Sequence, residues 1–373
     1  MQNTKPKVAI IGTNGLPGKY GGWDQLLNHL TLNLREKYNF IVYTSYFDAE
    51  KGLKEFNGAK LKIIKLKANG MQSVLYDIVS LIHAAFKYDI LLVLGTSGCI
   101  FLPVIRLFRK KIILNPDGCE WKRGKWSKPV QAFLKLSEKF GVRFSDFVVA
   151  DNAIIQEYIK NAYHKKSELI EYGGDQATFV PMRDETRRKY SLEINNYAFK
   201  VCRIEPENNI HIILEAFKNT NMDLVIVGNW NFSNYGKELR SKYRDYKNLK
   251  LLDPIYEQTS LNEIRSNCGL YIHGHSVGGT NPSLVEAMNI GLCPIVFNVD
   301  YNRETTENQA IYFNSADDLI KIITDYQNKK IDTSIYKEKM KEIAKRRYTW
   351  EIITDKYSDV FLKEKNANTH NRN

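Results

Sequence analysis

Short apolar runs alternate with segments of helical periodicity along nearly the whole chain, and this alternation restricts the possible folds more than any other feature. In the first half the expected strands are residues 7–12, 40–43, 61–65, 90–94, 112–115 and 147–150. Helical patterns occupy residues 23–37, 73–86 and 130–140, and the segment 73–86 is predicted to be an amphipathic helix. Such regular alternation is typical of a parallel sheet whose strands are joined by crossover helices.

The alternation starts again in the second half of the chain. The expected strands there are residues 198–203, 224–228, 249–252, 270–273 and 293–298, and the expected helices are residues 210–217, 260–266 and 282–289. Two series of similar length predict two Rossmann-like domains, residues 1–172 and 173–350, with a hinge near residues 172–181. The polar tail, residues 365–373, is predicted to be disordered.

Composition narrows the class of protein further. A chain of 373 residues is long enough for two domains with separate cores. Its five cysteines are scattered and form no CxxC pair, which argues against a disulfide framework or structural zinc and suits a reducing cytoplasm. The longest uncharged run, residues 90–105, contains glycines and a proline, so a buried strand and a helix start are expected there rather than a membrane span. The first residues are too short a leader for a signal peptide.

Positive charge is concentrated in the first half of the chain. Residues 1–172 contain 26 Lys and Arg against 15 Asp and Glu, whereas the remainder contains 28 against 27. This imbalance predicts an anionic partner for the first domain, and nucleic acid, an anionic membrane surface or a polyprenyl phosphate would all fit.

The segment HSVGGTNPSLVEAM is the most informative motif. Pro282 suits the first position of a helix, and Asn281 before it is expected to cap the helix. Such a helix start attracts anions, and Gly278 and Gly279 allow a phosphate to approach the backbone. Glu286 follows just over one turn later, within reach of sugar hydroxyls. The pattern predicts a site for a nucleotide-sugar diphosphate, and the alternative is an ordinary capped core helix with Glu286 on its solvent-facing side.

Two loops of the first half carry further candidates. Residues 12–24, GTNGLPGKYGGWD, resemble a phosphate-binding loop without a clean GxGxxG pattern, and the alternative is a flexible surface turn. In residues 115–128, NPDGCEWKRGKWSK, Asp117 or Glu120 is a candidate general base or hydroxyl ligand. The basic and tryptophan residues of that segment suit a lipid-phosphate surface, and the alternative is a charged surface loop with one tryptophan in the core.

Arg203 lies at the end of an expected strand, where an arginine can hold a diphosphate through two parallel hydrogen bonds. The alternative is a structural ion pair with Glu205 or Glu207. His273 and His275 lie two residues apart without a third ligand, so packing or hydrogen bonding is expected of them rather than metal binding.

With these pieces in order, the chain resembles the retaining GT-B glycosyltransferases of family 4 over nearly its whole length. More narrowly, it resembles the bacterial β-1,4-rhamnosyltransferases of polysaccharide assembly. The matching motifs are YGGWD, DGCEWKRGKW, IEYGGD, RIEPENN, HGHSVGGTNPSLVEAM and YNRETTEN. The resemblance implies an α/β GT-B fold, with two Rossmann-like domains facing each other across a cleft. It also implies that a C-terminal helix, about residues 351–364, crosses back to the N-terminal domain.

For function, the resemblance implies that the C-terminal domain binds a nucleotide-sugar donor, dTDP-rhamnose in the narrower family. The N-terminal domain would bind a lipid-linked saccharide on undecaprenyl diphosphate, which places the protein peripherally at the inner face of the plasma membrane. The nucleotide sugar is a co-substrate, and no cofactor, metal or nucleic acid is expected. The expected mechanism is front-face substitution with retention, in which Arg203 and helix amides stabilise the leaving phosphate.

The site candidates fall into three groups. The catalytic candidates are Asp117, Glu120 and Arg203, with Asp151 as a weaker one. The donor-binding candidates are Gly21, Gly22, Arg203, Asn208, Asn209, Gly278, Gly279, Thr280, Asn281, Ser283 and Glu286. The candidates for acceptor or membrane contact are Tyr20, Trp23, Asp24, Trp121, Lys122, Arg123, Lys125 and Trp126.

Two positions depart from the pattern of the family. Glu286 matches the second acid of its Glu-x7-Glu motif, but the first acid is replaced by Gly278. The basic residue expected shortly after Arg203 falls within Asn208 and Asn209. The donor sugar is therefore the point on which this chain should differ from the broader family.

Three other functions remain open from the sequence. The chain could transfer a sugar from another donor, such as UDP-glucose or GDP-mannose. It could be a sugar-nucleotide epimerase on the same fold, or a non-catalytic binder of anionic membranes or nucleic acid.

Overall fold

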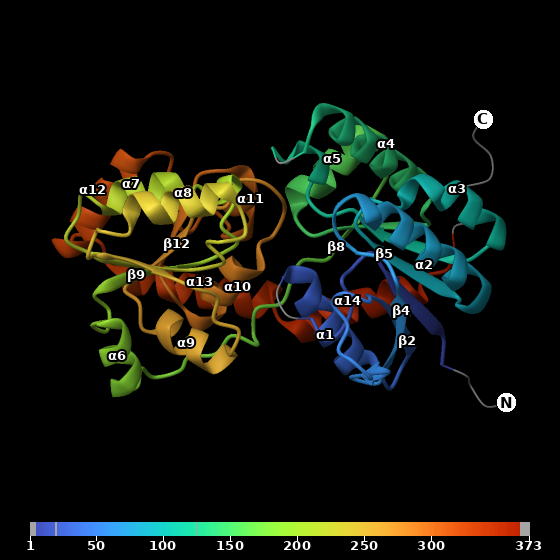
Figure 1. Ribbon diagram of the computed structural model, residues 1–373, viewed down its shortest axis with the longest axis horizontal. Coiled ribbons are helices and arrows are strands. Elements are labelled where there is room, and N and C mark those ends of the chain that lie inside the picture. The colour runs from blue at the N-terminus through green and yellow to red at the C-terminus, as the bar shows by residue number, and fades with distance from the viewer. Residues whose placement is uncertain (1–4, 19–20, 125, 366–373) are drawn as a thin grey trace. The chain divides into compact units, whose positions relative to one another are not determined.

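The computed structural model describes residues 5–18, 21–124 and 126–365, which form two compact units (Figure 1). Unit 1 contains the chain up to Tyr172 and again from Trp350 onward, whereas unit 2 runs from Gly173 to Thr349. Each unit is a mostly parallel sheet with helices packed on it, so the α/β class expected from the alternation is confirmed. Among the described residues, no helix is both long and apolar enough to cross a membrane.

The sheet of unit 1 has the strand order β3-β4-β2-β1-β5-β6-β7-β8. Its strands are β1 (Lys7–Ile11), β2 (Asn39–Ser45), β3 (Glu55–Phe56), β4 (Ala59–Ile64), β5 (Ile90–Leu94), β6 (Lys111–Asn115), β7 (Phe147–Ala150) and β8 (Glu168–Leu169). All pairs are parallel except β3 with β4. All five residues of β5 are buried, because helices cover both faces of a sheet of this kind.

The helices of unit 1 are α1 (Gly22–Leu34), α2 (Ser73–Lys87), α3 (Leu102–Ile105), α4 (Lys128–Phe144), α5 (Ala153–Tyr163) and α14 (Trp350–Leu362). Four short 3₁₀ helices accompany them: η1 (Gly70–Gln72), η2 (Cys99–Phe101), η3 (Arg106–Phe108) and η4 (Glu120–Lys122). Helix α2 packs on β1 and β5, and α14 packs on α1. Between α1 and α14, His29 stacks on Trp350 with the ring centroids 4.4 Å apart. Tyr38, which follows α1, meets Phe361 of α14 with the ring centroids 5.2 Å apart.

The sheet of unit 2 has the order β11-β10-β9-β12-β13-β14, and every pair is parallel. Its strands are β9 (Tyr197–Val201), β10 (Asp223–Val227), β11 (Leu249–Leu252), β12 (Leu270–His273), β13 (Pro294–Phe297) and β14 (Ile311–Phe313). Its helices are α6 (Asp184–Tyr190), η5 (Pro206–Asn208), α7 (Ile210–Phe217), α8 (Asn234–Tyr243), α9 (Gln258–Ser266), α10 (Pro282–Ile290), α11 (Asp300–Thr305), α12 (Ala316–Gln327) and α13 (Thr333–Arg347).

The strands expected from the sequence differ from the observed ones by at most two residues at either end. Two helices differ by more. The first ends at Leu34 instead of residue 37, and α4 extends two residues before and four beyond the expected 130–140. Strands β3, β8 and β14 were not expected, because two or three residues are too few to show a period of two. Residues 366–373, nearly all of the tail predicted to be disordered, lie outside the described residues.

Candidate active site

In unit 2 the strand order reverses between β9 and β12, so the loops that follow these strands meet at the carboxyl edge of the sheet. The backbone N–H and the hydroxyl of Ser276 both donate to the carbonyl of Glu207, at 2.9 and 3.0 Å. Asn209 donates from Nδ2 to the carbonyl of Gly274 at 2.9 Å. A Cβ on Gly274 would lie 2.4 Å from the carbonyl oxygen of Asn208, so only glycine permits this approach. The two loops therefore form one hydrogen-bonded frame.

Asn208 and Asn209, where the resemblance implies a basic residue, are both buried. Asn208 donates from Nδ2 to the carbonyl of Arg203 at 2.9 Å, and its Oδ1 lies 3.3 Å from Nδ1 of His275. Both amides are thus used to hold the frame together. Direct contact of either asparagine with a donor stays a prediction. Their hydrogen bonds show that they position the two loops relative to each other.

Arg203 follows β9 by two residues, and its side chain is 48% exposed. Its Nε lies 3.8 Å from Oε2 of Glu205, which is the ion pair that the alternative interpretation anticipated. At that distance and exposure the pair is weak. The guanidinium therefore remains accessible to an anion from solution.

The start of α10 corrects one expectation. Asn281 caps the helix as predicted, because its Oδ1 accepts the N–H of Ser283 at 3.0 Å. The N–H groups of Leu284 and Val285 donate to the Asn281 carbonyl, and Pro282 has no N–H. The first amides of the helix are therefore engaged within the protein. The helix amides that were expected to bind an anion are therefore not free at this end of α10.

Gly278 stands where the resemblance implies an acid, and its backbone conformation suits glycine. Its φ of +125° lies in the region that side chains with a Cβ rarely adopt. A Cβ built there would also lie 3.3 Å from Nε2 of His275. The backbone of this loop is shaped for glycine, so the departure is a structural property of the loop.

Glu286 is only 8% exposed, so it does not lie on a solvent-facing side of α10. Its Oε2 accepts from Nη1 of Arg265, and its Oε1 accepts from Nε2 of Gln176 at 2.7 Å. Arg265 on α9 is completely buried and also donates to Oδ1 of Asn262. Each carboxylate oxygen has a second lone pair, so Glu286 can still accept a hydroxyl of a bound ligand.

Sequence reasoning missed Arg265 and Gln176. Arg265 lies in a helix of ordinary polarity, and no local pattern distinguishes it from a surface arginine. Gln176 follows the glycine pair of the IEYGGD motif. The second glycine of that pair, Gly174, was the one local sign that this segment lies close to another backbone. A Cβ on Gly174 would lie 2.6 Å from the carbonyl of Val285, so this segment runs directly against the backbone of α10.

Two further titratable side chains are buried near this edge. Lys200 of β9 is 1% exposed, and burial lowers its pKa. His273 is 2% exposed, and burial together with the charge of Lys200 lowers its pKa well below the usual value, so its ring is neutral. Nε2 of His273 has no hydrogen-bond partner among the described residues. In that same part of the chain, no group of three His, Cys, Asp or Glu is arranged to hold a metal ion.

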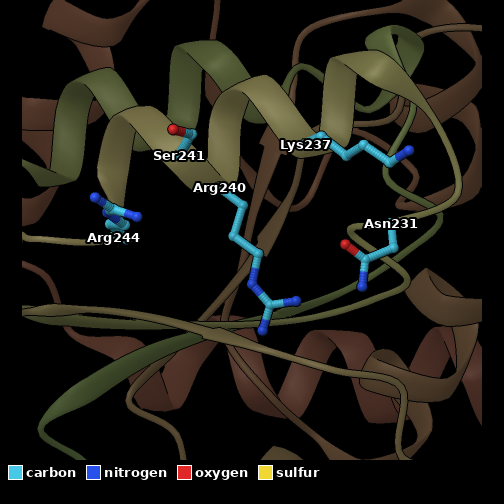
Figure 2. Close-up of a pocket in the computed structure, with 5 residues that line it drawn as sticks. All are labelled: Asn231, Lys237, Arg240, Ser241 and Arg244. Carbon is cyan, nitrogen blue, oxygen red and sulfur yellow. The ribbon is translucent and has the colours of Figure 1, made fainter.

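A hollow of about 320 Å³ lies elsewhere on unit 2, along α8 (Figure 2). It is lined by Asn231, Lys237, Arg240, Ser241 and Arg244. Arg240 pairs with Asp253 at 2.7 Å, and the three cationic side chains point away from one another (Figure 2). The hollow is therefore not a converged anion site, and the candidate site remains at the β9–β12 edge.

In unit 1, the loop after β6 brings two carboxylates together around one arginine. Nε of Arg123 lies 2.7 Å from Oε2 of Glu120, and its Nη2 donates to Oδ2 of Asp117 at 3.3 Å. Trp126 donates from Nε1 to Oε1 of Glu120 at 3.0 Å. Asp117 has a φ of +65°, a strained conformation that often marks functional loops.

This arrangement corrects the expected membrane contact of the segment. The Arg123 side chain is 9% exposed and lies between two acids, so it cannot meet lipid phosphates. The ring of Trp121 is covered by the ammonium groups of Lys135 at 4.6 Å and Lys122 at 5.4 Å. Lys122 is exposed, whereas Lys125 lies outside the described residues.

The start of α1 lies at the point where the strand order of unit 1 reverses, between β1 and β5. Gly21 is its N-cap with a φ of +136°, Gly22 is its first residue, and no side chain caps the helix. The ring of Trp23 packs on Gly95, where a Cβ would lie 2.9 Å from it. Asp24 is buried, and Tyr20 lies outside the described residues.

Asp151, the weaker catalytic candidate, is 3% exposed at the end of β7. Its charge helps to raise the pKa of the buried tyrosines Tyr172 and Tyr357, although burial is the larger cause for both. Asp151 is thus surrounded by the core of unit 1, and the more exposed Asp117 is the better placed of the two acids.

Comparison with known proteins matches each half of the chain to a different family. Residues 182–347 match the family "Glycosyl transferases group 1", and residues 5–175 match "Domain of unknown function (DUF1972)". The chain carries a glycosyltransferase group 1 domain. No protein of curated function matches the sequence.

Solved structures of the same fold include sucrose-phosphate synthase from Thermosynechococcus elongatus. That match has a TM-score of 0.81 at 14% identity and covers 96% of this chain and 98% of that one. HepE from Anabaena, solved with UDP, matches with a TM-score of 0.75 at 15% identity and covers 95% and 99%. The catalytic domain of starch synthase IV from Arabidopsis thaliana, bound to ADP and acarbose, has a TM-score of 0.70 at 13% identity, with 96% and 98% covered. The glycosyltransferase group 1 domain of this chain is therefore part of a GT-B fold.

Proposed function

We propose that this chain is a retaining glycosyltransferase that takes a sugar from a nucleotide donor bound by unit 2 and transfers it to a saccharide bound by unit 1. The observation that carries the proposal is that unit 2 has both an accessible cation, Arg203, just after β9 and a buried carboxylate, Glu286, in the helix after β12, held by Arg265 and Gln176. A nucleotide diphosphate needs a cation for its phosphates and an acceptor for its ribose hydroxyls.

The donor proposal has support from proteins of the same fold. HepE was solved with UDP-glucose, and starch synthase IV with ADP. For this chain the sequence motifs favour dTDP-rhamnose, and the glycine conformation at Gly278 favours a sugar that does not require the family's first acid.

In the proposed mechanism, the acceptor hydroxyl attacks the anomeric carbon from the face on which the bond to the diphosphate breaks. The leaving phosphate takes the hydroxyl proton, and Arg203 stabilises the charge that develops on it. Asp117 orients the acceptor, with Arg123 and Glu120 holding it in place. No protein nucleophile and no cofactor beyond the nucleotide sugar is needed.

The proposed acceptor is a lipid-linked saccharide on undecaprenyl diphosphate, as in cell-surface polysaccharide assembly. The excess of positive charge in residues 1–172 supports an anionic acceptor and a peripheral position at the inner face of the plasma membrane.

The deciding experiment offers purified protein a panel of dTDP-, UDP- and GDP-sugars with a lipid-linked saccharide acceptor. We expect transfer from one donor class with retained anomeric configuration. Free epimerised nucleotide sugar formed without acceptor would show an epimerase instead. Absence of turnover with every donor, together with absence of nucleotide binding, would refute enzymatic transfer.

The site assignment is tested by Arg203→Ala. Since the side chain is half exposed and weakly paired, we expect donor binding to weaken by about 1 kcal/mol or more with little change in stability. Arg187→Ala is the control, because its side chain lies on the same unit and is 46% exposed against 48% for Arg203. Unchanged donor affinity in Arg203→Ala would remove this residue from the site.

A further inference from the structure

Helix α2 of unit 1 has an outward face without a charged residue. Leu75, Val79, Ile82 and Phe86 are all exposed large apolar side chains. At about 100° per residue they fall within roughly 60° of one another, so they form a single stripe along the helix. The charged residues of α2 lie outside this stripe, because its one acid, Asp77, is buried and its one lysine, Lys87, is the last residue of the helix.

The stripe continues into the turns at both ends of α2. Met71 in η1 is 96% exposed, and Leu107 in η3 is 79% exposed. Phe108 of η3 packs edge-on against Phe86 with ring centroids 4.7 Å apart, which joins η3 to the stripe. We call Met71, Leu75, Val79, Ile82, Phe86 and Leu107 the α2 surface. A continuous exposed apolar surface of this kind marks an interaction site.

Cations outnumber acids in the segments that carry the α2 surface. Lys67 precedes η1, and its backbone N–H bonds to Gln72 at 3.0 Å. Lys62 and Lys87 lie close enough to His83 of α2 to lower its pKa, although burial is the larger cause. Arg109 follows η3 directly and is exposed. Residues 57–116, which form this side, contain nine Lys and Arg against two acids, the buried Asp77 and the exposed Asp89.

We propose that the α2 surface docks onto an anionic lipid bilayer. Apolar side chains at the tips of two turns insert between acyl chains, while lysines beside them reach the headgroups with their ammonium groups. A second copy of this chain is a poor occupant, because two such surfaces would bring like charges together. The proposal replaces the membrane contact expected at Arg123 and Trp126, and it rests on the proposed function only in the choice of a lipid-linked acceptor.

The test is flotation of the full chain with vesicles of equal parts phosphatidylcholine and phosphatidylglycerol, and with vesicles of phosphatidylcholine alone. We expect binding to the anionic vesicles that weakens as salt is raised. The variant Leu75→Gln/Phe86→Gln should lower the partition coefficient on the order of tenfold or more.

A matched control is available elsewhere on the chain. Ile335 and Leu362 are 57% and 67% exposed, against 58% and 68% for Leu75 and Phe86. We expect Ile335→Gln/Leu362→Gln to bind vesicles as the unchanged protein does. Phe86 contacts Phe108, so its replacement could also disturb the fold. A second variant, Met71→Gln/Leu107→Gln, changes the two most exposed side chains of the α2 surface and should lose vesicle binding as well.

Three results would overturn the proposal: no vesicle binding by the unchanged chain, equal binding by the α2-surface variants and the control, or a shift to dimers in place of vesicle binding. Titration with dTDP and UDP separates this test from the proposed function. The α2-surface variants should keep nucleotide affinity, and Glu286→Ala should keep vesicle binding.

Discussion

Arg265 compensates the buried negative charge of Glu286 in unit 2. A carboxylate that is nearly inaccessible to water is costly unless an opposite charge compensates it, and Arg265 supplies that charge from α9. Gln176 holds the other oxygen from the segment that follows the glycine pair. At the scale of single residues, the candidate donor site is thus a carboxylate oriented by two partners that are far away in sequence.

We expect Arg265→Met to reduce the free energy of unfolding by about 3–5 kcal/mol, because it leaves a buried carboxylate without its cation. Arg265→Met/Glu286→Met should regain much of that stability, yet neither variant should bind nucleotide normally. Denaturant unfolding and calorimetric titration measure the two quantities. Arg240→Met, which breaks the more exposed pair with Asp253, is the control and should cost less than about 1 kcal/mol. Full stability and full nucleotide affinity in Arg265→Met would contradict this account.

At the scale of elements, the loop before α10 and the helix α2 both depend on glycines that let backbones approach. Gly278 has a positive φ beside His275. Gly98, after β5, lies so close to α2 that a Cβ would be 2.4 Å from Cβ of Asp77. The absence of a Cβ at these two positions sets how closely each element packs against its neighbour.

We expect Gly278→Ala to destabilise unit 2 by about 1–2 kcal/mol, the cost of placing a Cβ in left-handed backbone. Gly124→Ala, where a Cβ would meet nothing within 4 Å, is the control. Thermal unfolding of both variants measures the difference. If Gly278→Ala melts together with Gly124→Ala, the loop conformation is not constrained as described.

Asp77 makes the stability with which α2 packs on unit 1 depend on pH. Burial raises its pKa from 3.8 to about 7, while hydrogen bonds with Ser97 and Gly98 act in the opposite direction. Because the folded pKa exceeds the unfolded one, the protonated form favours the folded state. This stabilisation is complete below pH 3.8 and is lost as pH rises to about 7.

Relative to Asp77→Asn, which cannot ionise, the unchanged protein should lose stability between about pH 4 and 7 and then stay level. Parallel denaturant titrations across this range give the difference directly. A constant difference over the whole range would show that Asp77 does not carry this pH dependence.

At the scale of the whole molecule, the chain ends by returning to the unit in which it began. Helix α14 packs on α1 and adds an ion pair between Lys356 and Glu171 at 2.7 Å. The last helix therefore contributes to the core of unit 1, although unit 2 precedes it in sequence.

We expect Trp350→Ala to destabilise unit 1 by about 3–5 kcal/mol, since the indole is 3% exposed and stacks on His29. Hydrogen exchange resolved by peptide should show faster exchange in α1 and α14 and unchanged exchange in unit 2. Ile335→Ala, an exposed position in α13, should change neither unit. Faster exchange confined to unit 2 would contradict the assignment of α14.

The sequence alone determined the α/β class, the positions of all strands except the short β3, β8 and β14, and the cap of α10 by Asn281. These features depend on local periodicity and on the preferences of a few adjacent residues, so they can be predicted without knowing the partners. It also brought Arg203 and Glu286 to attention through motifs. It could not show that Glu286 is held by Arg265, that Arg123 is buried between two acids, or that the outward face of α2 is apolar and exposed. Only the tertiary structure decided these points, because burial and charge pairing depend on residues that folding brings together from distant parts of the chain.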